Sequence, residues 1–250
     1  MKSTRHSVLR HALRLLGLLL LCAVALQWVF LLRVALMTVV DPQSSTFQRS
    51  EAWRLLSEQQ RILWSQQWVD GPALSAHLKR AVIASEDAGF VEHSGVEWDA
   101  IERAWEKNQR IQARAERVGP PRPGARPPKV VGGSTITQQL AKNLLLSGER
   151  TVVRKGQELV LTTMLETLLS KQRILEIYLN NVEWGEGIFG AQAAARHYFQ
   201  VDAARLSPQQ AARLAVMLPA PKRFEKNPSS PYVLGRAATI VARMGDVALP

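Results

Sequence analysis

The sequence has very little cysteine and fewer acidic than basic residues. Cys22 is the single cysteine among 250 residues, so an internal disulfide is excluded and no cysteine-ligated metal cluster can form. Against 32 Lys and Arg stand only 21 Asp and Glu, which leaves a net charge of +11. This surplus favours an anionic partner, namely nucleic acid, a membrane surface or a phosphate-bearing substrate. Charge alone does not choose among the three.

Alternating polar and apolar residues are also scarce, and no internal repeat is visible. Long β-strands are therefore not expected. Apolar residues make up 46% of the chain, which is enough to bury a substantial core. From His77 onward most windows have helical periodicity, so the sequence predicts a mainly α-helical domain over residues 77–250. Residues 118–131 are too rich in Pro and Gly to be regular and are interpreted as an exposed basic insertion.

One long apolar run stands near the N-terminus. Leu15–Leu32 contains no charge and is long enough to cross a bilayer as a helix. We expect residues 15–40 to be a transmembrane anchor and residues 1–14 to be a basic cytoplasmic tail, because positive residues stay on the cytoplasmic side. A cleaved signal peptide ending near Ala23–Ala25 is the less favoured alternative, since the apolar run continues beyond that point.

Residues 41–76 are expected to form a linker followed by a short juxtamembrane helical segment. The stretch "DPQSS" is a cluster of helix breakers, and Trp53, Leu56, Leu63 and Trp64 follow at roughly helical spacing. Such a segment packs on the main domain or lies on the membrane surface. Its sequence does not distinguish these two arrangements.

The stretch "ASEDAGFVEHSG" concentrates acidic residues after an apolar helix. Leu78, Val82 and Glu86 are spaced four apart, so a helix places Glu86 on the same stripe as two apolar side chains. Burial, the negative end of the helix and the neighbouring Asp87 are expected to raise the pKa of Glu86 toward the range of a general base or acid. The alternative is a solvated helix end, and a metal site that adds Glu92 and His93 is less favoured.

The stretch "GGSTITQQLAKN" combines flexible glycines with a helix start. Thr135 and Gln138 predict a capping box, while Ile136, Leu140 and Leu144 form the buried stripe. Hydroxyls, amides and a lysine near a helix N-terminus are suited to holding a phosphate. An ordinary capped helix with a polar face fits the spacing equally well.

Two further stretches carry charged residues at helical spacing. Glu158 lies four residues after Arg154 and three after Lys155, which predicts a partly shielded carboxylate beside cations. Simple intrahelical ion pairs are the alternative. In "KQRILEIYLN", Tyr178 belongs to a core stripe, and Glu176 is interpreted as structural.

Five blocks of sequence occur in a characteristic order: "EDAGFVEHSG", "GGSTITQQLAKN", "RKGQE", "KQRILEIYLN" and "GIFGAQAAARHYF". With the trailing "LPAPKRF" they span roughly residues 78 to 224. In this order they resemble the peptidoglycan glycosyltransferases of glycosyltransferase family 51, most closely the monofunctional biosynthetic peptidoglycan transglycosylases. Five ordered blocks are far more specific than any one of them.

The resemblance implies a mainly α, lysozyme-like, two-lobed glycosyltransferase domain behind one N-terminal transmembrane helix. It implies an enzyme in the cytoplasmic (inner) membrane, with a periplasmic catalytic domain that polymerises lipid II into glycan strands. The transfer inverts the configuration at the anomeric carbon and releases undecaprenyl pyrophosphate. The expected partners are lipid II, the growing glycan strand, the membrane and other cell-wall synthesis proteins, with no nucleic acid.

The resemblance also assigns roles to residues. Glu86 is the expected general base, and Glu158 is the second catalytic carboxylate, assisting acceptor or cation placement. Asp87, Phe90 and His93 are expected to support the base. The substrate-binding residues are expected to be Lys142, Arg150, Arg154 and Lys155 at the pyrophosphate, with Ser134, Thr135, Gln138, Gln139 and Asn143 lining the cleft.

The resemblance requires no cofactor and no protein metal site, although it allows a divalent cation, Mg or Mn, at the pyrophosphate. This chain differs from the family in its longer Pro-rich insertion. It also contains no "SxxK" and no "KTG", so transpeptidase activity is not expected and cross-linking is left to a partner protein.

Two other functions compete with this interpretation. A lysozyme-like lytic enzyme would use Glu86 as an acid, but it has no need of a cationic phosphate site. A non-catalytic basic membrane scaffold would bind lipid head groups by charge alone. Strand growth from lipid II distinguishes the polymerase from both.

Overall fold

The computed structural model describes residues 2–118, 133–149 and 151–250, with side chains described from residue 10 and not for residues 115–118. The insertion predicted at 118–131 and the predicted phosphate ligand Arg150 therefore lie outside or at the edge of the described residues. The chain forms two compact units, Met1–Asp41 and Pro42–Pro250. The second unit is mainly helical, as the sequence predicts.

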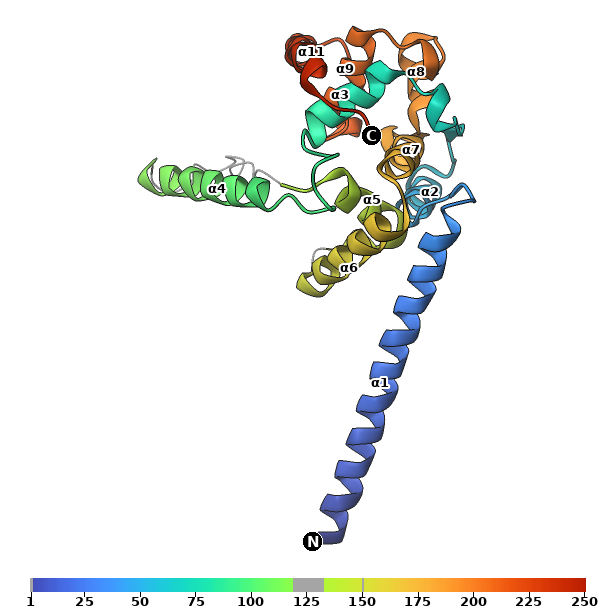
Figure 1. The fold of residues 1–250 in the computed structure, drawn as a ribbon, viewed down its shortest axis with the longest axis vertical. Coiled ribbons are helices and arrows are strands. Elements are labelled where there is room, and N and C mark those ends of the chain that lie inside the picture. The colour runs from blue at the N-terminus through green and yellow to red at the C-terminus, as the bar shows by residue number, and fades with distance from the viewer. Residues whose placement is uncertain (1, 119–132, 150) are drawn as a thin grey trace. The chain divides into compact units, whose positions relative to one another are not determined.

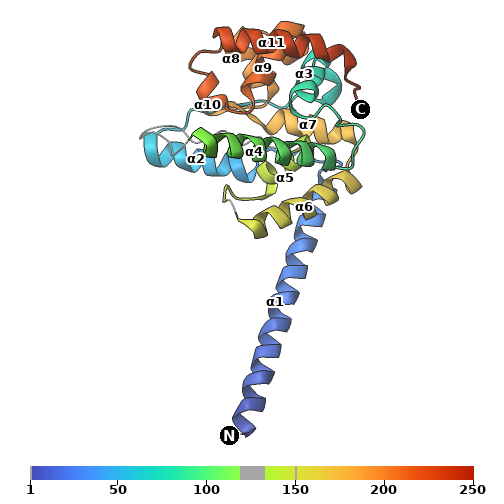
Figure 2. The same cartoon turned by 90° about the vertical axis from the view of Figure 1, so that its left-hand side faces the viewer.

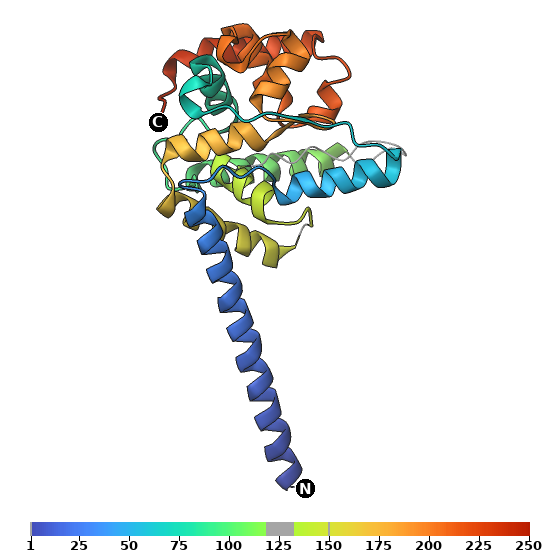
Figure 3. The same ribbon diagram turned by 90° about the vertical axis from the view of Figure 1, so that its right-hand side faces the viewer.

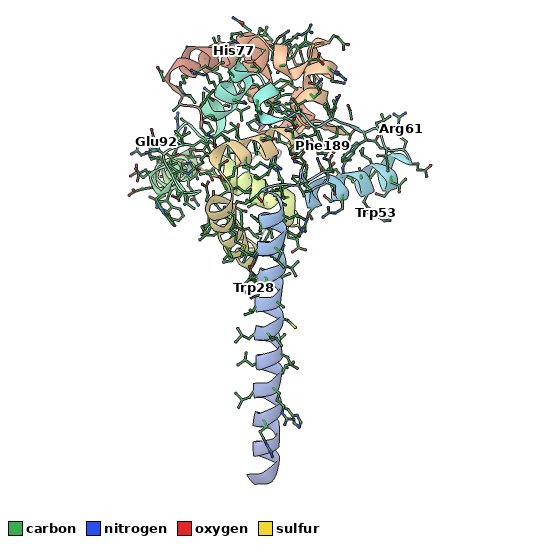
Figure 4. The ribbon with its side chains drawn as sticks, turned by 45° about the vertical axis from the view of Figure 1, so that its right-hand side comes forward. Trp28, Trp53, Arg61, His77, Glu92 and Phe189 are labelled. Atoms are coloured by element: carbon green, nitrogen blue, oxygen red, sulfur yellow. The ribbon has the colours of Figure 1, made fainter. Side chains whose placement is uncertain are left out.

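The first unit is one long helix, α1 (Lys2–Leu36). Its segment Arg10–Leu36 is 27 residues long and apolar enough to cross a membrane. At about 1.5 Å per residue the segment is roughly 40 Å long, which exceeds the hydrocarbon thickness of a bilayer. This single N-terminal helix fits a single-pass membrane anchor, and apolar side chains such as Trp28 project from it (Figure 4).

The helices of the second unit form two groups. One group contains α3 (Ala76–Glu86), α9 (Pro208–Met217) and α11 (Pro231–Arg243), in which α9 packs against both other helices. The other contains α2 (Thr46–Gln59), α5 (Ile136–Leu145) and α6 (Val152–Leu168), packed through α5. Figures 2 and 3 show α7 (Lys171–Asn181) lying between the two groups.

Each of these helices begins where its sequence supplies a capping residue. Ser45, Thr135 and Ser207 form capping boxes with the Gln three residues later, which satisfies backbone N–H groups at the helix start. The capping box of α5 confirms the one predicted from Thr135 and Gln138. Polar side chains thus set the start of the helices, while the apolar stripes decide which face is buried.

The segment that contains α2 packs on the main domain. Leu55 of α2 is buried, and Thr46 donates a hydrogen bond of 3.0 Å from its hydroxyl to the carbonyl of Leu144 in α5. Trp53, by contrast, lies on the exposed side of the helix (Figure 4). Of the two arrangements left open for residues 41–76, the structure therefore places α2 against the helical domain.

A small sheet completes the unit. Strand β1 (Ser65–Gln66) pairs in parallel with β3 (Ile188–Phe189), and β2 (Glu183–Gly185) pairs antiparallel with β3. Phe189 is fully buried and stacks on Trp64 at 4.4 Å between ring centroids. Strands of two or three residues are too short to show alternation in the sequence.

The remaining elements are short or lie at the edges. They are the single turns η1 (Gly71–Ala73), η2 (Ala203–Arg205) and η3 (Met244–Asp246), and the helices α4 (Trp98–Val118), α8 (Ala191–Phe199) and α10 (Pro221–Phe224). Helix α4 extends away from the other helices of its unit (Figure 1).

Candidate active site

Glu86 is the last residue of α3. Val82 and Leu78, one and two turns before it, are fully buried, so the predicted apolar stripe directs Glu86 into the interior of the domain, where it is half-buried. Gln139 of α5 donates a hydrogen bond of 3.0 Å from Nε2 to Glu86 Oε2. Burial raises the pKa of Glu86, and the charge of Asp87 raises it further, while the bond from Gln139 opposes the shift. The predicted upward shift is confirmed.

A buried tyrosine orients the amide that bonds Glu86. Tyr178 of α7 donates a hydrogen bond of 3.0 Å from its hydroxyl to Gln139 Oε1. Burial, helped by the charges of Glu86 and Asp87, holds the pKa of Tyr178 well above its ordinary value, so the phenol remains a neutral donor. With Oε1 engaged by Tyr178, the amide nitrogen must face Glu86. The sequence identified Tyr178 only as a core residue.

Asp87 links the end of α3 to the start of α5. Its Oδ2 accepts a hydrogen bond of 2.9 Å from the backbone N–H of Ile136, the first residue of α5. Its Oδ1 lies 2.8 Å from His93 Nε2. Since Gly95 donates its backbone N–H to His93 Nδ1 at 3.1 Å, the ring proton lies on Nε2 and is donated to Asp87. This pair fixes α5, and with it Gln139, against Glu86.

Phe90 and Thr135 complete the support of the base. Phe90 is fully buried, and Lys171 Nζ lies 4.5 Å from the centroid of its ring. Thr135 caps α5 and donates a hydrogen bond of 2.6 Å from its hydroxyl to the carbonyl of Gly95. Both side chains therefore serve the architecture around Glu86.

Asp87, His93 and Glu97 bring three ligand atoms within 4.8 Å of one another. Hydrogen bonds already account for this cluster, because the His93 ring binds Gly95 and Asp87, and Glu97 pairs with Arg103 at 2.7 Å. A metal ion would have to displace the proton on His93 Nε2 and break its bond to Asp87. Glu92, which the metal site considered from the sequence combined with Glu86, Asp87 and His93, is exposed and is not part of this cluster.

A cavity of about 770 Å³ collects most of the predicted substrate-binding residues. It is lined by Ser134, Gln138, Gln139, Lys142, Asn143, Arg154, Lys155 and Glu158, together with Glu149, Glu183, Leu218 and Pro221 among others. Residues far apart in the sequence thus line the same cavity. Three of the predicted phosphate-binding cations, Lys142, Arg154 and Lys155, are among them. The fourth, Arg150, lies outside the described residues.

Glu158 is buried within this cavity wall, with only 3% of its surface exposed. Arg154 Nη1 lies 2.8 Å from Glu158 Oε2, and Lys155 Nζ pairs with Glu158 Oε1. Both carboxylate oxygens are therefore engaged by cations, at the helical spacing that the sequence predicts. The arrangement holds Arg154 and Lys155 in place beside the cavity.

A second, smaller pocket of about 290 Å³ contains Glu86. It is lined by Glu86, Asp87, Glu97, Ala100, Arg103, Ala104, Lys107, Gly133, Ser134 and Thr135. Ser134 borders both pockets, and Gln139 borders the larger pocket while it bonds Glu86. The carboxylate of Glu86 therefore lies beside the junction of two pockets, which suits a reaction between two substrates.

One buried carboxyl of the cavity is absent from the sequence-based assignments. Glu183 on β2 is 7% exposed and lines the larger cavity. Burial raises its pKa to about 7, with Lys222 lowering it and the charges of Glu51 and Glu225 raising it. No local pattern in "NNVEWG" indicates a site residue, because the groups around Glu183 come from α2, from α10 and from Glu225 just after α10.

Comparisons with known proteins place these residues in a family. The family model described as "Transglycosylase" matches residues 55–245. A biosynthetic peptidoglycan transglycosylase of Burkholderia thailandensis is 53% identical over 226 residues, covering 90% of this chain and 82% of the relative. The proteins of the same name from Paraburkholderia xenovorans (47%, 91% and 90% covered) and Bordetella avium (52%, 84% and 83% covered) are similarly close.

Proposed function

This chain belongs to the transglycosylase family, whose members build peptidoglycan by glycosyl transfer, and from that premise we propose that it polymerises lipid II into glycan strands. The observation that carries the proposal is the arrangement of Glu86. A half-buried carboxyl with a raised pKa lines a pocket that shares Ser134 with a larger one, and the lining of the larger pocket includes the cations Lys142, Arg154 and Lys155.

The two pockets receive the two substrates. The pyrophosphate of the donor, the growing strand, binds in the larger cavity against Lys142, Arg154 and Lys155. The sugar of the acceptor lipid II enters the smaller pocket, which brings its 4-hydroxyl to Glu86. Ser134 contacts both substrates, since it borders both pockets.

Glu86 acts as the general base. Its carboxylate takes the proton from the acceptor hydroxyl as that oxygen attacks C1 of the donor sugar, and the bond from C1 to the pyrophosphate oxygen breaks with inversion. The charge of the departing undecaprenyl pyrophosphate is neutralised by the basic residues, so little acid catalysis is needed. Gln139 holds the carboxylate by its N–H bond during the transfer.

Glu158 acts by positioning the side chains of Arg154 and Lys155. Because Arg154 and Lys155 occupy both of its oxygens, the carboxylate positions their charges toward the pyrophosphate and takes no proton itself. The reaction requires no cofactor. A divalent cation, if it assists, is held by the substrate pyrophosphate and not by a dedicated protein site.

The helix α1 places this chemistry at the inner membrane. With the basic residues at the start of α1 in the cytoplasm, the catalytic domain faces the periplasm, where the lipid-linked substrate is exposed. The enzyme has no transpeptidase activity and supplies strands to transpeptidases that cross-link them. It binds no nucleic acid.

The test is incubation of the purified chain with lipid II in detergent micelles, followed by separation of the glycan products by length. We expect strands that grow with time and undecaprenyl pyrophosphate released in step with them. Shortening of preformed strands without any growth would instead establish a lytic enzyme. Binding of lipid II without turnover would establish a scaffold.

A further inference from the structure

The larger cavity has apolar lining that a pyrophosphate does not explain. Phe47, Val182, Leu218 and Pro221 are part of this lining, and their side chains offer neither charge nor a hydrogen bond to a phosphate. The volume of about 770 Å³ lies within the range of pockets that enclose a whole small-molecule ligand. The cavity therefore has room for a further portion of the substrate, one with apolar surface, beside the two phosphate groups.

Phe47 is the one aromatic side chain among the described residues that line this cavity. It is half-buried and makes an edge contact with Phe189, with 6.2 Å between ring centroids and 67° between ring planes (Figure 4). Phe189 is fully buried and stacks on Trp64. Phe47 thus packs on a fixed aromatic base, while part of its own surface stays open at the cavity.

The start of α2 holds the backbone of Phe47 in place. The preceding Thr46 bonds to the carbonyl of Leu144 in α5. The following Gln48 is 1% exposed and donates a hydrogen bond of 3.4 Å from Nε2 to the carbonyl of Asn181 at the end of α7. Both neighbours of Phe47 are therefore tied to other helices, and the ring is presented to the cavity by a rigid element.

A pyranose ring matches this combination of groups. The face of an aromatic ring is electron-rich, so it attracts the C–H groups that form the apolar face of a sugar. The hydroxyl and acetamido groups at the edge of the sugar need polar partners, and Ser134 and Asn143 line the same cavity. A polyprenyl chain, which is apolar on every side, would displace water from these polar groups without replacing its hydrogen bonds.

We propose that Phe47 is a binding residue for a sugar ring of the donor strand, which packs on the phenyl ring while Lys142, Arg154 and Lys155 hold the adjoining pyrophosphate. The inference rests on the proposed function for the identity of the ligand. Phe47 precedes residues 55–245, which the family model matches. The segment that follows the N-terminal helix thus contributes to the substrate site and does more than connect the two units.

The test compares a ligand that carries sugars with one that carries none. The first is the lipid-linked tetrasaccharide that one transfer between two lipid II molecules produces, and the second is undecaprenyl pyrophosphate. The full chain in detergent micelles carries Glu86→Gln throughout, so that neither ligand is consumed. Each ligand is scored by its displacement of a fluorescent prenyl pyrophosphate, which restricts the measurement to the cationic cavity.

Phe47→Leu keeps an apolar side chain but removes the ring. It should raise the Kd for the tetrasaccharide about tenfold and the Kd for undecaprenyl pyrophosphate less than about twofold. Phe47→Met should show the same selective loss with a more flexible side chain, in case branched leucine disturbs the contact with Phe189. Phe47→Tyr keeps the ring and should retain the affinity for the tetrasaccharide within about twofold.

Phe199→Leu is the matched control. Phe199 is a half-buried phenylalanine of α8 whose ring centroid lies 4.9 Å from the Arg213 guanidinium, and it is outside the lining of both pockets. Its replacement should leave both Kd values unchanged. Thermal unfolding of each variant shows whether the fold is kept.

Three results would overturn the inference. An equal loss for both ligands in Phe47→Leu and Phe47→Met would assign the ring to the polyprenyl chain. An unchanged affinity for the tetrasaccharide, or the same loss in Phe199→Leu, would remove Phe47 from the site. Strand growth with Glu86 intact is scored separately, so a selective loss without growth overturns only the proposed function, and growth without a selective loss overturns only this inference.

Discussion

The two carboxylates assigned to catalysis, Glu86 and Glu158, are held in opposite ways. Glu86 receives a hydrogen bond from a neutral amide, Gln139, which is itself held by the phenol of Tyr178. Glu158 is paired with two cations of its own helix. Burial raises the pKa of Glu86. Both oxygens of Glu158 are instead occupied by the cations Arg154 and Lys155.

This difference distinguishes a carboxylate suited to proton transfer from one that positions neighbouring cations. A general base must exchange a proton near neutral pH, which a carboxylate in neutral surroundings can do. A carboxylate whose oxygens both accept from cations instead fixes the direction of those cations. We therefore expect proton transfer on the α3–α5 side of the site and charge neutralisation on the α6 side.

Glu86→Gln should produce the largest effect, because the amide cannot accept the proton of the acceptor hydroxyl. We expect kcat for lipid II polymerisation to fall by about 10²–10⁴-fold while the thermal unfolding temperature stays unchanged. Glu92→Gln, an exposed carboxylate of the same stretch, is the control and should keep full activity. Near-normal turnover in Glu86→Gln would refute the assignment of the base.

Arg154→Met should come next, because it removes one cation from the cavity and leaves Glu158 with Lys155 alone. A hydrogen bond to a charged group contributes about 1.5–3 kcal/mol, so kcat/KM should fall about 10- to 150-fold. The control is Arg110→Met, which removes an exposed arginine of α4. An effect of the same size in both variants would mean that only overall charge matters.

Gln139→Leu should have the smallest effect and should change the pH profile. The bond from Gln139 lowers the pKa of Glu86, so its loss should move the acidic limb of the kcat profile to higher pH. A neutral hydrogen bond contributes about 1 kcal/mol, which corresponds to about a fivefold loss of rate at neutral pH. Tyr178→Phe removes only the bond that orients the Gln139 amide, so it should shift the acidic limb of the kcat profile less. An unchanged acidic limb in both Gln139→Leu and Tyr178→Phe would contradict the role of Gln139.

Much of the helical architecture was accessible from the sequence, because capping residues and apolar stripes are local signals. The stripe of Leu78, Val82 and Glu86 placed a carboxyl toward the interior, and the spacing of Arg154 and Lys155 from Glu158 predicted their ion pairs. Both features depend only on the period of one helix. The choice of Glu86 as a base came from the ordered blocks and not from that period.

Contacts between elements could not be predicted in this way. Tyr178 and Gln139 are 39 residues apart, and Asp87 and Ile136 are 49 apart, so neither hydrogen bond has a local pattern. The sheet was not predicted because its strands of two or three residues are too short to show polar–apolar alternation. Glu183 was not identified because its surroundings come from distant parts of the chain. Glu51, Lys222 and Glu225 reach it from separate segments.

By itself the sequence determined the helical class, the apolar N-terminal segment and the capped start of α5, and it nominated the residues expected to carry the chemistry, because each follows from local spacing or from the ordered blocks. Only the tertiary structure decided what surrounds each carboxyl. Burial at the end of α3 raised the pKa of Glu86, and Glu183 on the sheet became buried beside the larger cavity. A pKa depends on burial and neighbouring charge, and both are properties of the assembled fold.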